Sequence, residues 1–248
     1  MSGHSKWSTI KHKKAKTDAK RGKMFTKVVR EITIAAKVGG ADPELNPRLR
    51  LALQKAKEAN MPNDNIKRAV EKGAGGSDGN ELEEIVFEAY GPNGVALMIP
   101  TLTDNKFRTV PNLKNILNRA GGSMASKGAV SYMFKSKGLI IFEPGHSEDT
   151  IMEVAMVTTV NDVLTNDDGS VEVITEPDLL DPVLQAFDSA NLRYISAELT
   201  MIPDVTVPLD LAAAEQILKL IDKLEDEDDV QNVFGNFDIP DEVMASLA

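Results

Sequence analysis

The spacing of apolar residues changes near residue 80 of this chain, and that change limits the folds it can adopt. Up to Lys72, apolar residues recur at intervals of three and four, as on one face of an amphipathic helix. After Glu81 they alternate, which is typical of half-buried strands. The segment between them is rich in glycine, and no Gly-Lys-Ser/Thr follows it to make a phosphate-binding loop. The sequence therefore predicts a helical domain over residues 1–73, a linker over 74–80 and an α/β body.

Three helices are predicted in the first domain. The first spans Asp18 to Lys37 and ends before Gly39-Gly40, because glycine readily adopts the left-handed conformation after a helix. The second begins at Asn46-Pro47, a capping residue followed by a proline suited to the first helical turn. The third runs from about Pro62 to Lys72. Together they have enough apolar surface for a small core.

The body divides into two parts. From Gly138 to Pro203 the order of predicted strands and helices is βαββαβ, which is that of a ferredoxin-like domain. Before it lie a hairpin, a helix over 108–120 and a short strand over 130–134, and after it a helix over 210–224 and a strand over 230–237. The predicted fold is α+β, with the three-helix domain and two ferredoxin-like α/β domains. One of these, 138–203, is inserted into the other, formed by 81–137 and 204–248.

Charge is also sorted along the chain. The first 72 residues hold 18 Lys or Arg and 7 Asp or Glu, a net charge of +11, whereas the whole chain has a formal net charge of −10. A basic end on an acidic body is typical of a protein that presents one part to a polyanion. Nucleic acid is the predicted polyanion, with an anionic membrane surface as the alternative to weigh.

Composition excludes several other functions. There are no cysteines and three histidines, so thiolate chemistry and Cys-ligated metals are excluded and material for a His-based site is scarce. No apolar run has the length of a signal peptide core or a membrane span. We expect a cytoplasmic, non-enzymatic protein with no catalytic residue, metal, cofactor or small-molecule substrate.

The strongest candidate site is the basic segment from His4 to Arg30. Its lysines and arginines can displace counterions from phosphates, and His12 can hydrogen-bond to phosphate. Trp7, the only tryptophan, either stacks on an unpaired base or anchors the arm of residues 1–17 to a helix. The predicted nucleic-acid-binding residues are Lys6, Trp7, Lys11, His12, Lys13, Lys14, Lys16, Lys20, Arg21, Lys23, Lys27 and Arg30. Further basic residues on the second helix, Arg48, Arg50, Lys55 and Lys57, either extend this surface or are ordinary solvated positions.

Two other segments invite a functional interpretation. Asn105, Lys106 and Arg108 form a candidate second polar surface at a helix N-terminus, although Asp104 or Asn105 could equally be a helix cap. The acidic run Glu225–Asp229 lacks the spacing of a calcium loop, and we interpret it as a solvated helix end.

Motifs spread over nearly the whole chain resemble those of the YebC/PmpR family, whose mitochondrial relatives include the translational activator of cytochrome c oxidase. They are Gly3-His-Ser-Lys-Trp7, Ile10-Lys-His-Lys-Lys14, Asp18-Ala-Lys-Arg-Gly-Lys-Met-Phe-Thr26, Asn46-Pro-Arg-Leu-Arg50, Asn60-Met-Pro62, Lys72-Gly-Ala-Gly-Gly76, Tyr90-Gly-Pro92, Leu102-Thr-Asp-Asn105, Val130-Ser-Tyr-Met-Phe134, Thr200-Met-Ile-Pro203 and Asp228-Asp-Val-Gln-Asn-Val233.

The resemblance implies a helical N-terminal domain with two α/β domains and a cytoplasmic regulator of gene expression. By the usual family label this is a DNA-binding transcriptional regulator. The alternative is a ribosome-associated translation factor that binds ribosomal RNA and relieves stalling at proline-rich stretches. From the residues themselves, a lysine-rich arm with one aromatic suits single-stranded or structured RNA at least as well as DNA. A third interpretation is a protein–protein module that uses the acidic α/β body.

Overall fold

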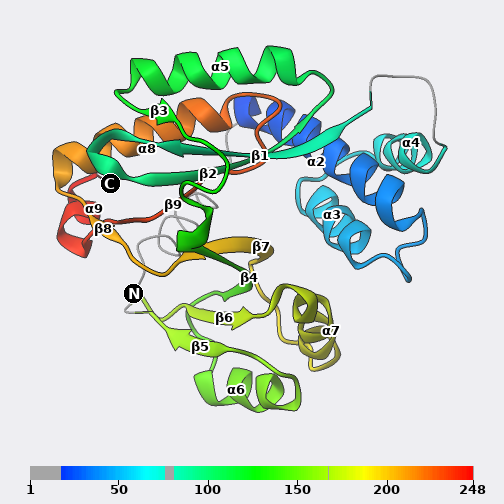
Figure 1. Cartoon of the computed structure of the whole chain (residues 1–248). Coiled ribbons are helices and arrows are strands. Elements are labelled where there is room, and N and C mark those ends of the chain that lie inside the picture. Colours follow the sequence, from blue (N-terminus) through cyan, green and yellow to red (C-terminus); the bar gives the residue numbers. More distant parts are fainter. Residues whose placement is uncertain (1–17, 76–80, 167, 248) are drawn as a thin grey trace. The chain divides into compact units, whose positions relative to one another are not determined.

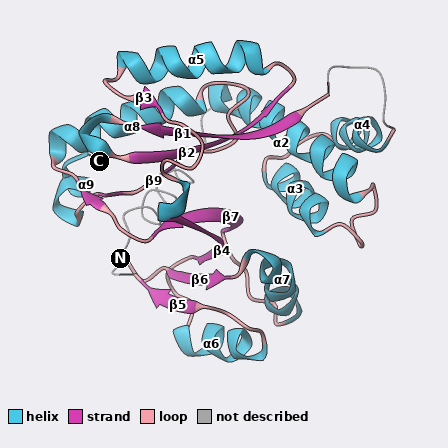
Figure 2. Cartoon of the chain, viewed as in Figure 1, coloured by secondary structure: helices cyan, strands magenta, loops and turns pink. Residues whose placement is uncertain are grey.

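The computed structural model describes residues 18–75, 81–166 and 168–247. Its elements form helical and mixed α/β parts, so the predicted α+β class is confirmed (Figures 1 and 2). Contacts along the chain define two compact units, Phe134–Ile202 and the remainder. The exact boundaries of the four predicted segments stay a prediction, and the predicted linker falls mostly on residues outside the described ranges.

The N-terminal helices pack around one small core. They are α2 (Asp18–Gly39), α3 (Pro47–Glu58) and α4 (Asn63–Ala74). The predicted cap is present, because the Asn46 side chain accepts a hydrogen bond from the backbone N–H of Leu49. The core consists of the apolar stripe of α2 with its counterparts on α3, on α4 and in the turn between them: Val28, Ile32, Ala35, Ala36, Leu49, Ala52, Ala56, Met61 and Ala69.

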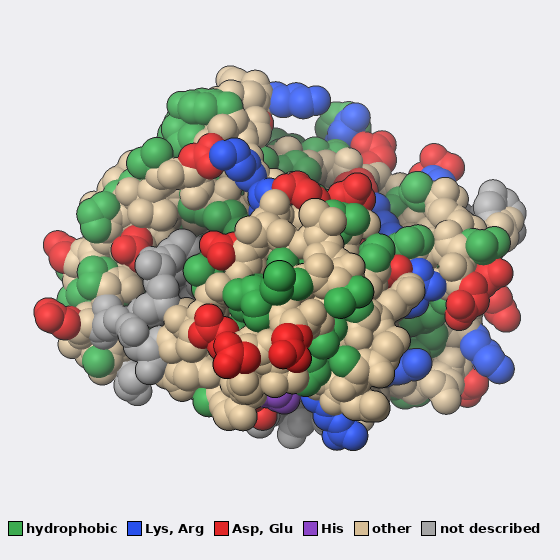
Figure 3. Space-filling model, turned by 90° about the horizontal axis from the view of Figure 1, so that it is seen from below, with side chains coloured by type: hydrophobic (Ala, Val, Ile, Leu, Met, Phe, Trp, Pro, Cys, Tyr) green, Lys and Arg blue, Asp and Glu red, His purple; other side chains and the backbone are tan. Residues whose placement is uncertain are grey.

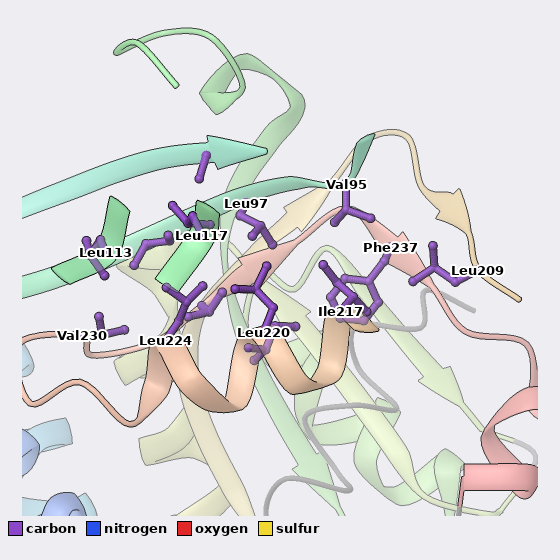
Figure 4. Packing of buried hydrophobic residues seen from close by; sticks show 14 of the residues in the cluster. Val95, Leu97, Leu113, Leu117, Leu209, Ile217, Leu220, Leu224, Val230 and Phe237 are labelled. Atoms are coloured by element: carbon purple, nitrogen blue, oxygen red, sulfur yellow. The ribbon is translucent and has the colours of Figure 1, made fainter. Parts of the chain in front are cut away.

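A four-stranded antiparallel sheet follows, with the strand order β3-β1-β2-β9. Its strands are β1 (Glu83–Tyr90), β2 (Ala96–Thr103), β3 (Ser123–Met124) and β9 (Phe234–Gly235), and the turn Pro92–Gly94 joins the first two. Helices α5 (Lys106–Arg119) and α8 (Leu211–Glu225) pack against one face of this sheet. Figure 4 shows Leu113 and Leu117 of α5 and Ile217, Leu220 and Leu224 of α8 gathered around Leu97 of β2.

The unit Phe134–Ile202, which in the sequence separates the two segments of the other unit, forms a sheet of its own. Its elements are β4 (Phe134–Phe142), α6 (Glu148–Val157), β5 (Asp162–Thr165), β6 (Val171–Thr175), α7 (Leu180–Ser189) and β7 (Ser196–Pro203). The strand order β5-β6-β4-β7, combined with the chain order βαββαβ, is that of the predicted ferredoxin-like domain. In the sheet β3-β1-β2-β9 the two central strands, β1 and β2, are joined by a hairpin. Its strand order therefore differs from that of a ferredoxin-like domain.

Two predicted strands differ from the structure. Residues Ser131–Met133 form a short 3₁₀ helix, and the strand begins only at Phe134. The reason is that the backbone N–H groups of Val130 and Ser131 donate to the Glu88 carboxylate instead of to a neighbouring strand. The predicted strand over 230–237 is broken into an isolated bridge at Val230, β9 and β10 (Phe237–Asp238).

Short elements near the end of the chain were missed by sequence analysis. Strand β8 (Val207–Pro208) pairs in parallel with β10, and helix α9 is formed by Asp241–Leu247. Strand β8 has too few residues to show a hydrophobic period.

Candidate nucleic-acid interface

The residues of the predicted basic arm lie outside the described part of the chain. These are Lys6, Trp7, Lys11, His12, Lys13, Lys14 and Lys16. Lys20 and Arg21 lie in α2, but their side chains are likewise outside the described part. The binding role of all nine stays a prediction.

The three remaining basic residues predicted on α2 face an acidic segment of the same chain. Lys23, Lys27 and Arg30 are spaced by four and three positions, so they share one side of the helix. Lys23 Nζ lies 3.0 Å from the Asp226 carboxylate, and Lys27 Nζ donates to the Glu225 carbonyl at 2.6 Å. This side of α2 therefore already has anionic partners within the protein.

Asp229 is the centre of this contact. This residue is 4% exposed, and its carboxylate accepts hydrogen bonds from Arg30 at 2.7 Å, Arg108 at 2.9 Å and the Thr109 hydroxyl at 2.6 Å. Thr103 Oγ1 also lies 3.2 Å from this carboxylate. Burial raises the pKa of Asp229, but the hydrogen bonds from Thr109, Arg108 and Arg30 outweigh it and lower the pKa below its ordinary value.

The interpretation of Glu225–Asp229 as a solvated helix end is therefore wrong for its last residue. Asp226 and Asp228 are exposed, as expected, whereas Asp229 is buried among cationic and hydroxyl donors. These donors come from α2 and from the start of α5, far away in the sequence. The acidic residues of this segment do not by themselves indicate which distant side chains they will contact.

At the predicted second surface, two of the three residues have structural roles. The Asn105 side chain caps α5 by accepting from the backbone N–H of Arg108 at 3.1 Å. Arg108 donates to Asp104 and to Asp229, both at 2.9 Å, and these bonds raise its pKa further. Lys106 is exposed and has no carboxylate partner among the described residues.

Two arginines that were considered on α3 are also held within the protein. Arg48 Nε donates to Glu31 at 2.8 Å, and its two terminal nitrogens donate to Glu84, each at 3.0 Å. Arg50 donates to the backbone carbonyls of Pro43 and Glu44. Arg48 thus connects α3 to α2 and to the first strand of the sheet.

Exposed cations remain on the outer sides of α3 and α4. None of the following has an ion-pair partner among the described residues: Lys55, Lys57, Lys67, Arg68 and Lys72. Sequence analysis had named only the first two as candidates. The other three could have been found from the apolar stripe of α4, which leaves them on the opposite, solvent-facing side.

On the face of the protein shown in Figure 3, acidic and basic side chains are mixed. An open cavity of about 390 Å³ lies beside α2, lined by Phe25, Val29, Arg30, Lys72 and Asp104 among others. Arg30 is paired with Asp229, and Asp104 is paired with Arg108. Lys72 is thus the charged lining residue that has no ion-pair partner among the described residues. The described residues contain no group of His, Asp and Glu arranged to hold a metal ion. They also include no helix with the length and apolar character needed to cross a bilayer.

Comparison with known proteins accounts for nearly the whole chain. Residues 5–76 match the TACO1/YebC protein N-terminal domain, and residues 82–237 match the TACO1/YebC second and third domain. A protein of Pseudomonas syringae pv. syringae is 51% identical over 247 residues, which cover 100% of both chains. A protein of Coxiella burnetii (strain RSA 493) is 50% identical over 98% of this chain and 100% of its own. Both are named "Probable transcriptional regulatory protein".

A solved structure supports the same relationship. The conserved hypothetical protein Aq1575 of Aquifex aeolicus superposes with a TM-score of 0.85 at 41% sequence identity, covering 95% of this chain and 97% of that one. Its fold agrees with the helical domain and the sheet domains described above. With family matches to all three domains and full-length relatives at about half identity, the chain belongs to the TACO1/YebC family.

Proposed function

We propose that this protein is a non-enzymatic regulator of gene expression in the cytoplasm that binds nucleic acid through its basic N-terminal domain. The observation that carries the proposal is the separation of charge. The first 72 residues have a net charge of +11, in a chain whose total is −10. Such a chain directs one end toward phosphates while its body is repelled by them.

The cations on α3 and α4 support this proposal. On α2, Lys23, Lys27 and Arg30 contact the acidic segment. In contrast, exposed cations without an ion-pair partner among the described residues are Lys55, Lys57, Lys67, Arg68 and Lys72. Since affinity for a polyanion comes mainly from unpaired lysines and arginines, we infer that these residues act together with the basic arm.

The names of the relatives favour DNA as the target, because two that match over their full length are called probable transcriptional regulatory proteins. One observation favours RNA instead. Trp7 lies between Lys6 and Lys11, and an aromatic residue among lysines suits stacking on an unpaired base. A factor bound to ribosomal RNA is therefore the second candidate.

Crosslinking in cells separates the two candidates. The intact protein is crosslinked by ultraviolet light, all bound RNA and DNA is sequenced, and the crosslinked residues are mapped. We expect adducts within residues 1–72. Discrete promoter DNA would support a transcriptional regulator, whereas enriched ribosomal RNA would support a translation factor. If neither nucleic acid is enriched, the proposal is wrong, and the acidic body becomes the surface to investigate for a protein partner.

The arm has its own test in vitro. Replacing Lys11, Lys13, Lys14 and Lys16 together by alanine should weaken binding and flatten its dependence on salt. The slope of log K against log salt should fall by up to ~0.9 for each phosphate that the variant no longer neutralises. An unchanged slope would exclude the arm from the interface.

A further inference from the structure

A second basic region lies inside the acidic body. From Asn105 to Met133 the chain has five Lys or Arg and no Asp or Glu. Over the rest of residues 73–248, five Lys or Arg stand against 31 Asp or Glu. This contrast is hidden in the overall charge of the body. It concentrates positive charge on α5 and on the loop that follows it.

Four of these five cations are available to a partner. Lys106, Lys114, Arg119 and Lys127 are exposed, and none forms an ion pair with another described residue. The fifth, Arg108, is bound to Asp104 and Asp229. Arg108 therefore has a structural role, whereas the other four cations have no ion-pair partner among the described residues.

An exposed phenylalanine lies among them. Phe107 is 84% exposed, and Lys106 Nζ lies over its ring, 5.8 Å from the centre. Val110, 37% exposed, and Lys114 follow at spacings of three and four, so all three lie along one stripe of α5. Thr109, Leu113 and Leu117 form the stripe that is buried against the sheet.

Figure 1 shows α5 lying along its sheet, with one side of the helix turned away from the strands. The exposed stripe thus presents an aromatic ring with Lys114 two turns further along it, and the Lys106 ammonium group lies over the ring. A flat apolar ring can stack on any base, while the flanking ammonium groups attract phosphates. A ring cannot read the edges of paired bases, and bases inside a duplex do not offer their faces.

We propose that α5 is a second nucleic-acid contact, at which Phe107 stacks on an unpaired base while Lys106 and Lys114 bind the adjoining phosphates. The partner is a single-stranded stretch of nucleic acid. The inference rests on the proposed function, because it places a further contact for the same ligand on the otherwise acidic body. Asn105 and Arg108, named as candidates from the sequence, hold α5 in place.

The test uses the full chain and fluorescent single strands of about 16 nucleotides, oligo(U) and oligo(dT), with a 2-aminopurine base in each. Anisotropy gives the affinity, and quenching of 2-aminopurine reports stacking. Phe107→Ala should weaken binding on the order of 5- to 100-fold and abolish part of the quenching, whereas Phe107→Trp should retain both. The double variant Lys106→Ala/Lys114→Ala should lower the salt slope by about 1.4, or ~0.7 for each phosphate.

Matched controls come from other surfaces. Leu45 is 80% exposed on the helical domain, so Leu45→Ala removes an exposed apolar side chain elsewhere. Lys219→Ala/Lys223→Ala removes two exposed lysines from α8. Both should bind like the wild type.

The outcomes distinguish the two proposals. If the full chain binds single strands but Phe107→Ala binds them equally well, the inference is wrong and the proposed function stands. Binding to duplex DNA alone also overturns the inference and leaves the proposed function. If the full chain binds no nucleic acid, both are wrong. A preference between oligo(U) and oligo(dT) identifies RNA or DNA as the source of the single strand.

Discussion

Arg30 of α2 donates a hydrogen bond of 2.7 Å to the carboxylate of Asp229, which lies 199 residues later in the chain. The same guanidinium nitrogen also donates to the carbonyls of Leu102 and Asp228. One arginine thus connects the first described helix to the end of β2 and to the segment after α8. A buried polar contact therefore joins the helical domain to the sheet.

Replacing Asp229 should loosen this connection. Asp229→Asn leaves Arg30 and Arg108 without their shared carboxylate and weakens the bond from Thr109. We expect the free energy of unfolding to fall by about 1–3 kcal/mol, because the hydrogen bonds are charge-assisted but Arg108 is half exposed and partly screened. Denaturant unfolding measures this change.

Asp228→Asn is the matched control. Asp228 is exposed and interacts with Arg30 through its backbone carbonyl, which the substitution leaves intact. Its effect should stay within about 0.5 kcal/mol. Equal losses from both variants would mean that the general negative charge of the segment matters and the buried carboxylate does not.

Stability should decrease in acid through two carboxylates. Burial raises the pKa of Glu88, but N–H groups of Gly128, Val130 and Ser131 lower it below its ordinary value of 4.5. The pKa of Asp229 is likewise below its ordinary value of 3.8. A depressed pKa means that each contribution is complete above the ordinary pKa and is lost as the pH falls through the lower value.

We therefore expect the free energy of unfolding to fall progressively once the pH drops below about 4.5. The variants Glu88→Gln and Asp229→Asn should each flatten this dependence. Urea midpoints at pH 7, 4 and 3 provide the measurement. Parallel curves for the wild type and both variants would show that other groups control acid unfolding.

The unpaired cations of α3 should contribute more to nucleic-acid binding than the paired ones of α2. Lys55→Ala/Lys57→Ala should lower the salt slope by up to ~0.9 for each contact with duplex DNA. Lys23→Ala/Lys27→Ala should change it less, because both amines already have partners on the acidic segment. Anisotropy over a salt series compares the two. A larger effect on α2 would show that nucleic acid displaces the acidic segment.

Gly73 marks the close approach of α4 to α2. A Cβ added there would lie 2.8 Å from the Cβ of Ala36 and even closer to the backbone carbonyl of Thr33. Gly73→Ala should therefore destabilise the protein by about 1–3 kcal/mol through overpacking. At Gly22, also helical, an added Cβ would meet nothing within 4 Å.

Gly22→Ala should accordingly stabilise by about 0.5–1 kcal/mol, since alanine has the higher helix propensity. Thermal or denaturant unfolding compares the two variants directly. Similar changes at both positions would contradict the packing seen between α2 and α4.

The sequence predicts those elements that are long enough for their spacing of apolar residues to repeat. The stripe through Ile32 and Ala36 predicted α2, and the Asn46-Pro47 pair predicted the start of α3; both are confirmed. Two-residue strands such as β8 carry no such repeat, and their pairing is set by the arrangement of the surrounding elements. Local pattern was therefore sufficient for the fold class but not for the pairing of short strands.

The candidate site was harder to predict because a sequence does not show which charged side chains form ion pairs with one another. Lys23 and Lys55 look alike in composition, yet one faces Asp226 and the other has no ion-pair partner among the described residues. Likewise, nothing local distinguishes Asp229 from Asp228. Which cation is available to a ligand is determined by contacts between segments far apart in the chain, and only the folded protein shows them.

The first sheet has a further consequence, for synthesis. The backbone N–H of Ala96 in β2 donates to the side chain of Asn236, 140 residues later, and the whole ferredoxin-like unit is made between them. At about 5–20 residues per second, the ribosome needs on the order of ten seconds to supply that partner. During this interval the apolar face of the β1–β2 hairpin has no α8 to cover it. The nascent chain is then a substrate for chaperones and proteases, and a ribosome that stops before α8 leaves a product that the cell can recognise as incomplete.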